Sequence, residues 1–89
     1  MSWNSSYASS FEKDLLTLRA AVREKALAAI GRVLSNPYQG KKLQGRPNRF
    51  SVRLGRDYRV VYSVYSHQRL IDFEFVGDRK EAYRWIRHS

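Results

Sequence analysis

The chain has 89 residues, of which 43% are hydrophobic and 28% are charged, values typical of a folded domain and not of a disordered chain. It has no cysteine, which excludes disulfides and cysteine-based metal sites, and no apolar run long enough to cross a bilayer. The formal net charge is +9 at pH 7, from 17 Lys and Arg against 8 Asp and Glu. We expect one domain over residues 1–89, in the cytoplasm, because the first ten residues lack the features of a signal peptide.

The positive charge is concentrated in the second half of the chain. Residues 1–40 contain five Lys or Arg and three acids, whereas residues 41–89 contain twelve and five, a net charge of +7. Between positions 41 and 59 there are seven basic residues and one acid, Asp57. This concentration predicts a polyanionic partner: nucleic acid, an anionic membrane surface or an acidic protein segment. The alternative is a basic, solvated surface without a partner, and a membrane helix is disfavoured because the cations lie in strand-like sequence.

The first 40 residues predict one strand followed by two helices. Alternation over residues 2–9 predicts a short strand, and the capping-box spacing of Ser9 and Glu12 predicts that a helix begins there. Apolar residues then recur at helical spacing, with a change of phase near residues 19–21 that indicates two helices. Pro37 ends the second helix, because proline disfavours the helical conformation in the residue before it.

The second half predicts three strands and a closing helix. Residues 38–47 predict a loop, and strands are expected at 48–54, 58–66 and 69–76, joined by connections short enough for antiparallel hairpins. Asp78 is placed to cap the last helix. The order βααβββα predicts an α+β domain, in which a small antiparallel sheet carries two N-terminal helices on one face and ends in a short C-terminal helix.

Alternation also predicts which strand residues share a face of the sheet. One face is apolar, and it comprises Phe50, Val52, Leu54, Tyr58, Val60, Tyr62, Val64, Ile71, Phe73 and Phe75. Val76 is expected on the opposite face with Asp72 and Glu74. Two helices cover only one face, so Arg53 and Arg59 should lie on the uncovered one.

Arg79 and Tyr83 follow the last strand and are within reach of the same surface. A cationic groove beside an aromatic ring suits nucleic acid, because Arg holds phosphates and the ring stacks on a base. The alternative is that Arg53 and Arg59 pair with acidic residues of the last strand.

Four stretches carry a family resemblance: "FEKDLLTL", the "NP…GKKLQG" loop, "RLGRDYRVVYSV" and "DFEFVGDRKEAY". The most specific are the arginine-bearing strand pair and the Gly-Asp-Arg-x-x-x-Tyr ending. In this order and spacing they resemble the RelE/ParE superfamily of bacterial toxins from type II toxin–antitoxin modules, and especially its RelE-like mRNA interferase branch. The resemblance covers nearly the whole chain and implies the fold derived above.

The resemblance implies a ribosome-dependent mRNA endoribonuclease that inhibits translation. In such a toxin the 2′-hydroxyl of the mRNA attacks the adjacent phosphate, without a metal or cofactor. By motif position, Arg59 matches an arginine that contacts the phosphate, Arg79 the arginine after the last strand, and Tyr83 the aromatic residue that stacks on or orients a base. Arg53 occupies a basic site on the second strand. The residues expected to contact mRNA or rRNA are Lys41, Lys42, Arg46, Arg49, Ser51 and Arg56.

The chain departs from the family pattern at Ser51, where relatives of the best-studied branch carry a lysine that contributes to proton transfer. Serine has no suitable pKa for a general base, and Arg53 is too basic to accept a proton readily. Neither His67 nor His88 fills the gap, since one lies in a predicted turn and the other is next to last. The general acid and base therefore stay unassigned.

Two other functions and a partner complete the expectations. The chain could instead be a gyrase-inhibiting toxin of the ParE branch, without catalytic activity, or an inactive relative that only binds RNA or a partner. The resemblance further implies a cognate antitoxin with an acidic, partly disordered segment that wraps the domain opposite Arg53, Arg59 or Arg79. That segment is expected to displace the C-terminal helix about a hinge at Gly77-Asp78.

Overall fold

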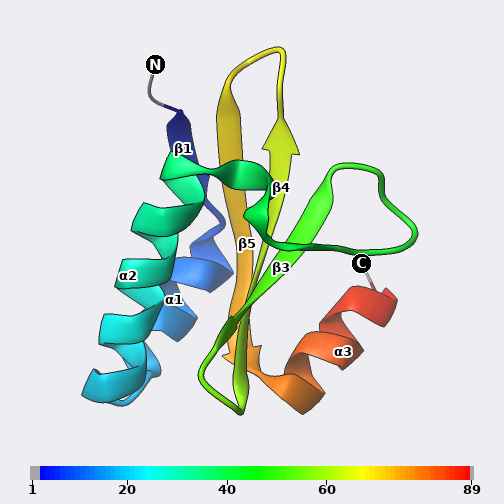
Figure 1. Cartoon of the computed structure of the whole chain (residues 1–89). Helices are drawn as coiled ribbons and strands as arrows, with labels where there is room; N and C mark the ends of the chain where they lie inside the picture. The colour runs from blue at the N-terminus through cyan, green and yellow to red at the C-terminus, as the bar shows by residue number, and fades with distance from the viewer. Residues whose placement is uncertain (1–2, 89) are drawn as a thin grey trace.

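Two helices cover one face of a five-stranded sheet and a third helix packs on the other face, in a computed structural model that describes residues 3–88 (Figure 1). The elements, in chain order, are β1 (Asn4–Tyr7), α1 (Ser9–Thr17), α2 (Ala20–Ser35), the 3-10 turn η1 (Pro37–Gln39), β2 (Lys41–Lys42), β3 (Arg49–Leu54), β4 (Tyr58–Tyr65), β5 (Leu70–Asp78) and α3 (Arg79–His88). The predicted fold class and element order are confirmed. Within the described part of the chain, no helix combines the length and apolar character that a membrane span requires.

The strands are arranged in the order β1-β5-β4-β3-β2. The pairs β3–β4 and β4–β5 are antiparallel as predicted, and β2 also pairs antiparallel with β3, but β1 runs parallel to β5, so the sheet is mixed. Alternation reports which face a residue occupies and carries no information on strand direction. The predicted loop at 38–47 contains one further short strand, β2, which pairs with Phe50 and Ser51 of β3.

The helix boundaries test the capping signals in the sequence. Helix α1 begins at Ser9 as predicted, but the capping box is not formed: the N-cap is Ala8, without a side-chain cap, and the backbone N–H of Ala8 donates to the Phe73 carbonyl at 3.0 Å. The bond to β5 therefore fixes the start of α1. The break between the two helices and the end of α2 before Pro37 are confirmed.

The core lies between the sheet and the pair α1 and α2. Its most completely buried large side chains are Phe11, Tyr62, Phe73, Ile71 and Val33. The apolar face predicted from alternation is confirmed for β3, for β4 and for β5 up to Phe73.

A one-residue bulge in β5 inverts the alternation beyond that point. Tyr62 pairs with Phe73 but its neighbour Val61 pairs with Phe75, so Glu74 is the extra residue. An insertion of one residue exchanges the two faces of a strand. Val76 is therefore in the core, 1% exposed, and Phe75 turns to the face of α3. The predicted positions of these two side chains are wrong for this reason.

Tyr62 provides a test of the core, because its buried hydroxyl donates a hydrogen bond to the Pro37 carbonyl at 2.7 Å. Tyr62→Phe should lower the free energy of unfolding by about 1–3 kcal/mol, since it leaves a buried carbonyl without this partner. Burial raises the pKa of Tyr62, so its phenol ionises first in the unfolded chain and wild-type stability should fall as the pH rises above 10. Urea unfolding at pH 7 and at alkaline pH measures both effects.

The matched control is Tyr38→Phe, at a tyrosine that is 55% exposed. We expect this variant to unfold within about 0.5 kcal/mol of wild type. Equal stabilities of the two variants would show that the Tyr62 hydroxyl is not a stabilising group.

Candidate functional site

Two arginines lie side by side on the face of the sheet that carries α3. Arg53 on β3 is directly opposite Arg59 on β4, and Arg59 is in turn opposite Gly77 on β5. Like charges directly opposite one another destabilise a sheet, so the pair is not explained by stability. The prediction that these arginines lie opposite the α1 and α2 face is confirmed.

The acidic residues of β5 have other partners. Glu74 forms an ion pair with Arg49 at 3.2 Å, and Asp72 accepts a hydrogen bond from the Ser6 hydroxyl at 2.9 Å. Among residues 3–88, neither Arg53 nor Arg59 is paired with a carboxylate. The alternative in which acidic residues of the last strand neutralise the two arginines is therefore wrong.

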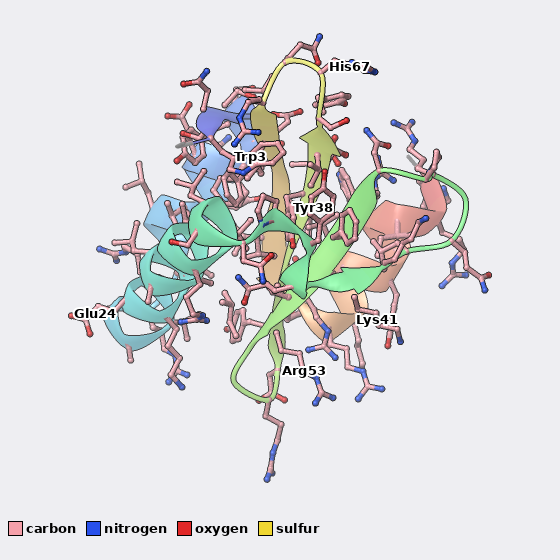
Figure 2. The ribbon with its side chains drawn as sticks, turned by 45° about the horizontal axis from the view of Figure 1, so that its top comes forward. Trp3, Glu24, Tyr38, Lys41, Arg53 and His67 are labelled. Carbon is pink, nitrogen blue, oxygen red and sulfur yellow. The ribbon has the colours of Figure 1, made fainter. Side chains whose placement is uncertain are left out.

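The two arginines line a cavity of about 600 Å³ between the sheet and α3. The residues around it are Gln39, Gly40, Lys41, Leu43, Ser51, Val52, Arg53, Arg59, Val61, Arg79, Ala82, Tyr83 and Ile86. Four of them are cationic and none is acidic. In Figure 2, Lys41 and Arg53 extend to the same side of the ribbon, whereas Glu24 projects from α2 on the other side. We call this cavity the cationic pocket.

The start of α3 brings the side chains of Arg79 and Tyr83 to the cationic pocket. Asp78 and Glu81 form a capping box, in which the Asp78 carboxylate accepts from the Glu81 N–H at 2.8 Å and the Glu81 carboxylate accepts from the Asp78 N–H at 3.3 Å. The predicted cap at Asp78 is thus confirmed. The backbone N–H of Arg79 donates to the Asp57 carbonyl at 2.8 Å, which ties the first turn of α3 to the β3–β4 turn.

Gly77 allows α3 to begin this close to the sheet. A Cβ atom at this position would meet Phe75 Cζ at 2.7 Å and Glu81 Oε1 at 3.1 Å. A side chain here would require the ring or the capping carboxylate to move.

Tyr83 is the titratable group whose environment is most informative. Its side chain is 51% exposed, and the Arg79 guanidinium carbon lies 5.7 Å from the centre of its ring. A hydrogen bond from Arg79, together with the charge of Arg79, lowers the pKa of the Tyr83 phenol below its ordinary value of 10.0, and Arg59 acts in the same direction. The phenol oxygen therefore faces two guanidinium groups while the ring remains accessible.

The cationic pocket unites six of the ten residues predicted for the site: Lys41, Ser51, Arg53, Arg59, Arg79 and Tyr83. Three others are exposed but lie outside it. Arg56 is in the β3–β4 turn, Arg46 is in the loop before β3, and Lys42 pairs with Phe50 and so belongs to the opposite face.

Arg49, the tenth, is only 4% exposed. Besides its ion pair with Glu74, its guanidinium lies 4.7 Å from the centre of the Trp85 ring. We therefore leave it out of the surface available to a ligand. Its burial had no local signal, because its partners are far along the chain.

Sequence reasoning missed the apolar wall of the cationic pocket, formed by Leu43, Val61 and Ile86. Val61 is completely buried although it lies on the arginine face. Alternation placed Val61 on the same face as Arg59, and an apolar residue on that face was the signal that could have predicted the wall. An apolar wall next to cations suits a ligand with both a flat ring and a phosphate.

The fold and the cationic pocket can now be compared with known proteins. A family model described as "ParE toxin of type II toxin-antitoxin system, parDE" matches residues 6–83. The class is thus that of small toxins of the RelE/ParE kind, and the chain belongs to the ParE toxin family of type II toxin–antitoxin systems. No sequence among curated proteins gives a significant match.

Solved structures of RelE proteins are similar along almost the whole chain. A chain of the intact E. coli RelBE toxin–antitoxin complex has a TM-score of 0.77 and 26% identity, over 84% of this chain and 94% of that one. The isolated E. coli RelE toxin gives 0.79 and 25%, over 94% and 98%. The archaeal RelE–RelB complex from Pyrococcus horikoshii gives 0.75 and 26%, over 89% and 97%. These likenesses agree with the fold described above.

The arrangement around Tyr83 predicts the effect of removing each arginine. Arg79→Gln should raise the pKa of the Tyr83 phenol toward 10.0, and Arg59→Gln should raise it by less, because Arg79 has the larger influence. NMR titration of the tyrosine ¹³Cζ resonances measures this, with Tyr83→Phe identifying the signal. The control is Arg87→Gln, at an exposed position of α3 outside the cationic pocket. A pKa that is the same in Arg79→Gln and in the control would contradict the arrangement.

Proposed function

We propose that this toxin is an mRNA endoribonuclease that acts on mRNA in the ribosome and so inhibits translation. One observation carries the proposal: Arg53, Arg59, Arg79 and Tyr83 converge on one cavity that has no carboxylate in its lining. Such a cavity favours a polyanion and offers a ring for a base to stack on. The likeness to RelE toxins supports the same reaction.

In the proposed reaction the substrate supplies its own nucleophile. The 2′-oxygen attacks the adjacent phosphorus, the bond from phosphorus to the 5′-oxygen breaks, and one proton leaves the 2′-hydroxyl while another reaches the 5′-oxygen. The chain then has to orient the phosphate, stabilise the charge of the phosphorane and transfer protons. Arg59 and Arg79 are placed for the first two tasks, and Arg53 adds charge beside them.

Proton transfer needs a group other than the lysine that the family resemblance implies, because Ser51 stands at that position. Tyr83 is a candidate for it, since its phenol faces Arg79 and Arg59 and its pKa is lowered. A more acidic phenol protonates a leaving oxygen more readily. The other role of Tyr83 is stacking of its exposed ring on a base, and the two roles make different predictions.

A second candidate function is inhibition of gyrase without catalysis. The family model that matches is that of a ParE toxin, and this observation favours it. A gyrase poison has no need of a cavity that combines arginines with an exposed ring, so we rank RNA cleavage first. Separate assays of mRNA cleavage and of the DNA-damage response in cells that express the chain distinguish the two candidates.

We also propose a cognate antitoxin as the physiological partner. The RelBE complexes, whose chains this protein resembles, are toxin–antitoxin assemblies. An acidic, partly disordered segment that occupies the cationic pocket would neutralise the surface that RNA uses.

Arg59→Ala and Arg79→Ala should each reduce the rate of RNA cleavage by about 10²–10³-fold, the usual effect of removing one preorganised charge contact. Both side chains point away from the core formed with α1 and α2, so neither change should leave a core cavity, and circular dichroism should stay native. Arg32→Ala, an equal change of charge at an exposed position of α2, is the control and should keep full activity. Undiminished cleavage in both pocket variants would overturn the proposed site.

Substitutions of Tyr83 separate its two possible roles. If the ring stacks on a base, Tyr83→Phe should retain most of the cleavage rate and Tyr83→Ala should lose it, because the π-face is kept only in Phe. If the phenol transfers a proton, both variants should lose it equally. Single-turnover cleavage measured across pH gives the answer. We expect the stacking result, and an equal loss would assign the step to the hydroxyl.

The antitoxin should bind one toxin domain tightly and exclude RNA from the cationic pocket. Association should slow as salt is added, because opposite charges steer the encounter. Stopped-flow binding at several salt concentrations, followed by competition with RNA, tests both points. A variant antitoxin with Asp and Glu changed to Asn and Gln is the control. Simultaneous binding of RNA and antitoxin would refute the blocking mechanism.

A further inference from the structure

Four buried or half-buried residues pack together between α3 and the sheet, on the side away from Tyr83. Trp85 stacks on Phe75 with 5.5 Å between ring centres and 27° between planes. The Arg49 guanidinium lies 4.7 Å from the centre of the Trp85 ring, and its Nε donates to the Glu74 carboxylate at 3.2 Å. We call Arg49, Glu74, Phe75 and Trp85 the α3 anchor.

The bulge in β5 creates the α3 anchor. If β5 were regular and Glu74 were paired opposite Val61, alternation would place Phe75 in the core with Phe73, and Trp85 would have no ring to stack on. The same extra residue supplies the carboxylate that holds Arg49. The α3 anchor therefore spans three elements, β3, β5 and α3, and its members are distant in the sequence.

Helix geometry connects the α3 anchor to the cationic pocket. Ala82, 2% exposed, is the buried residue of α3 and faces the sheet. Each residue advances about 100° around an α-helix, so Tyr83 and Trp85 lie on opposite flanks of Ala82. Ala82 is small, so its own contact with the sheet does not set the rotation of the helix about its axis. A planar contact on one flank fixes that rotation, and with it the position of the other flank.

We propose that Arg49, Glu74 and Trp85 are positioning residues that set the rotation of α3 and thereby hold Tyr83 and Arg79 in the cationic pocket. A role in stability alone explains the geometry less well, because apolar side chains stabilise a helix contact without the cost of burying an ion pair. The fixed plane of the Arg49 guanidinium, held by Glu74 at one edge and by the Trp85 ring at its face, gives direction as well as contact. The consequence for RNA cleavage rests on the function proposed above, whereas the position of Tyr83 does not.

The test measures the Tyr83 phenol in the free protein. In wild type it faces Arg79 and Arg59, with Arg53 and Lys41 as the other cations around the cationic pocket. Trp85→Leu removes both planar contacts of the α3 anchor but keeps an apolar helix former, and Arg49→Lys keeps the charge opposite Glu74 but loses the plane. In both variants the pKa of Tyr83 should rise toward 10.0 while amide exchange shows α3 still docked. Trp85→Phe, which retains a stacked ring, should restore most of the wild-type titration.

Trp3→Leu is the matched control, because Arg69 lies over the Trp3 ring at 4.6 Å but Trp3 does not line the cationic pocket. It should leave the Tyr83 titration unchanged. An unchanged titration in Trp85→Leu and Arg49→Lys with α3 docked would overturn the inference. So would undocking of α3 in both, because the α3 anchor would then hold the helix on the sheet without setting its rotation.

RNA cleavage by the same variants is the second readout. With Tyr83 and Arg79 displaced, the rate in Trp85→Leu should fall by about 10²-fold, as misplacement by about 1 Å can produce. If the wild-type protein cleaves no RNA but the variants shift the Tyr83 titration, the positioning role of the α3 anchor is supported and the proposed function is overturned. Full cleavage with a shifted titration would overturn the role of the α3 anchor in positioning the site.

Discussion

One extra residue in β5 determines how the two faces of the sheet are used. Up to Phe73, alternation directs apolar side chains toward α1 and α2, and after Glu74 the same strand directs Val76 there instead. The exchange leaves Phe75 free to pack against Trp85, so α3 has an apolar surface on the opposite face. A regular strand would direct these apolar side chains to one face of the sheet only, and α3 would have no apolar surface to pack on. The cationic pocket exists because α3 is held at an edge of that second face and leaves β3 and β4 open beside it.

The charge on this face is arranged at a cost to the folded state. Arg53 and Arg59 occupy directly opposite positions, and like-charged pairs of this kind destabilise a sheet. The acids within reach are committed elsewhere, Glu74 to Arg49 and Asp72 to Ser6. A bound polyanion would remove this repulsion, so part of its binding energy is relief of strain already present in the toxin. The paired strands hold the two arginines opposite one another, whereas arginines on a flexible loop would move apart.

The sequence was sufficient where the information was local. Alternation over β3 and β4 identified the arginine face, and Asp78, as a capping residue, identified the start of α3. It was insufficient where a residue's environment depends on a distant partner. The bulge at Glu74 has no Gly or Pro to mark it, and the burial of Arg49 depends on that glutamate 25 residues later in the chain. The parallel direction of β1 and the cap at Ala8 are likewise set by contacts with β5.

Two tyrosines illustrate how environment separates a structural hydroxyl from one that is available to a ligand. Burial raises the pKa of Tyr62, whose hydroxyl bridges the sheet to η1 and is inaccessible. Arg79 and Arg59 lower the pKa of Tyr83, whose side chain is half exposed in a cavity. Desolvation acts on a group that has been removed from water, whereas neighbouring charges act on a group that remains available to a ligand. The perturbed pKa of Tyr83 therefore marks a functional candidate, because its exposed side chain lines a cavity in which a ligand can meet the group whose acidity has been changed.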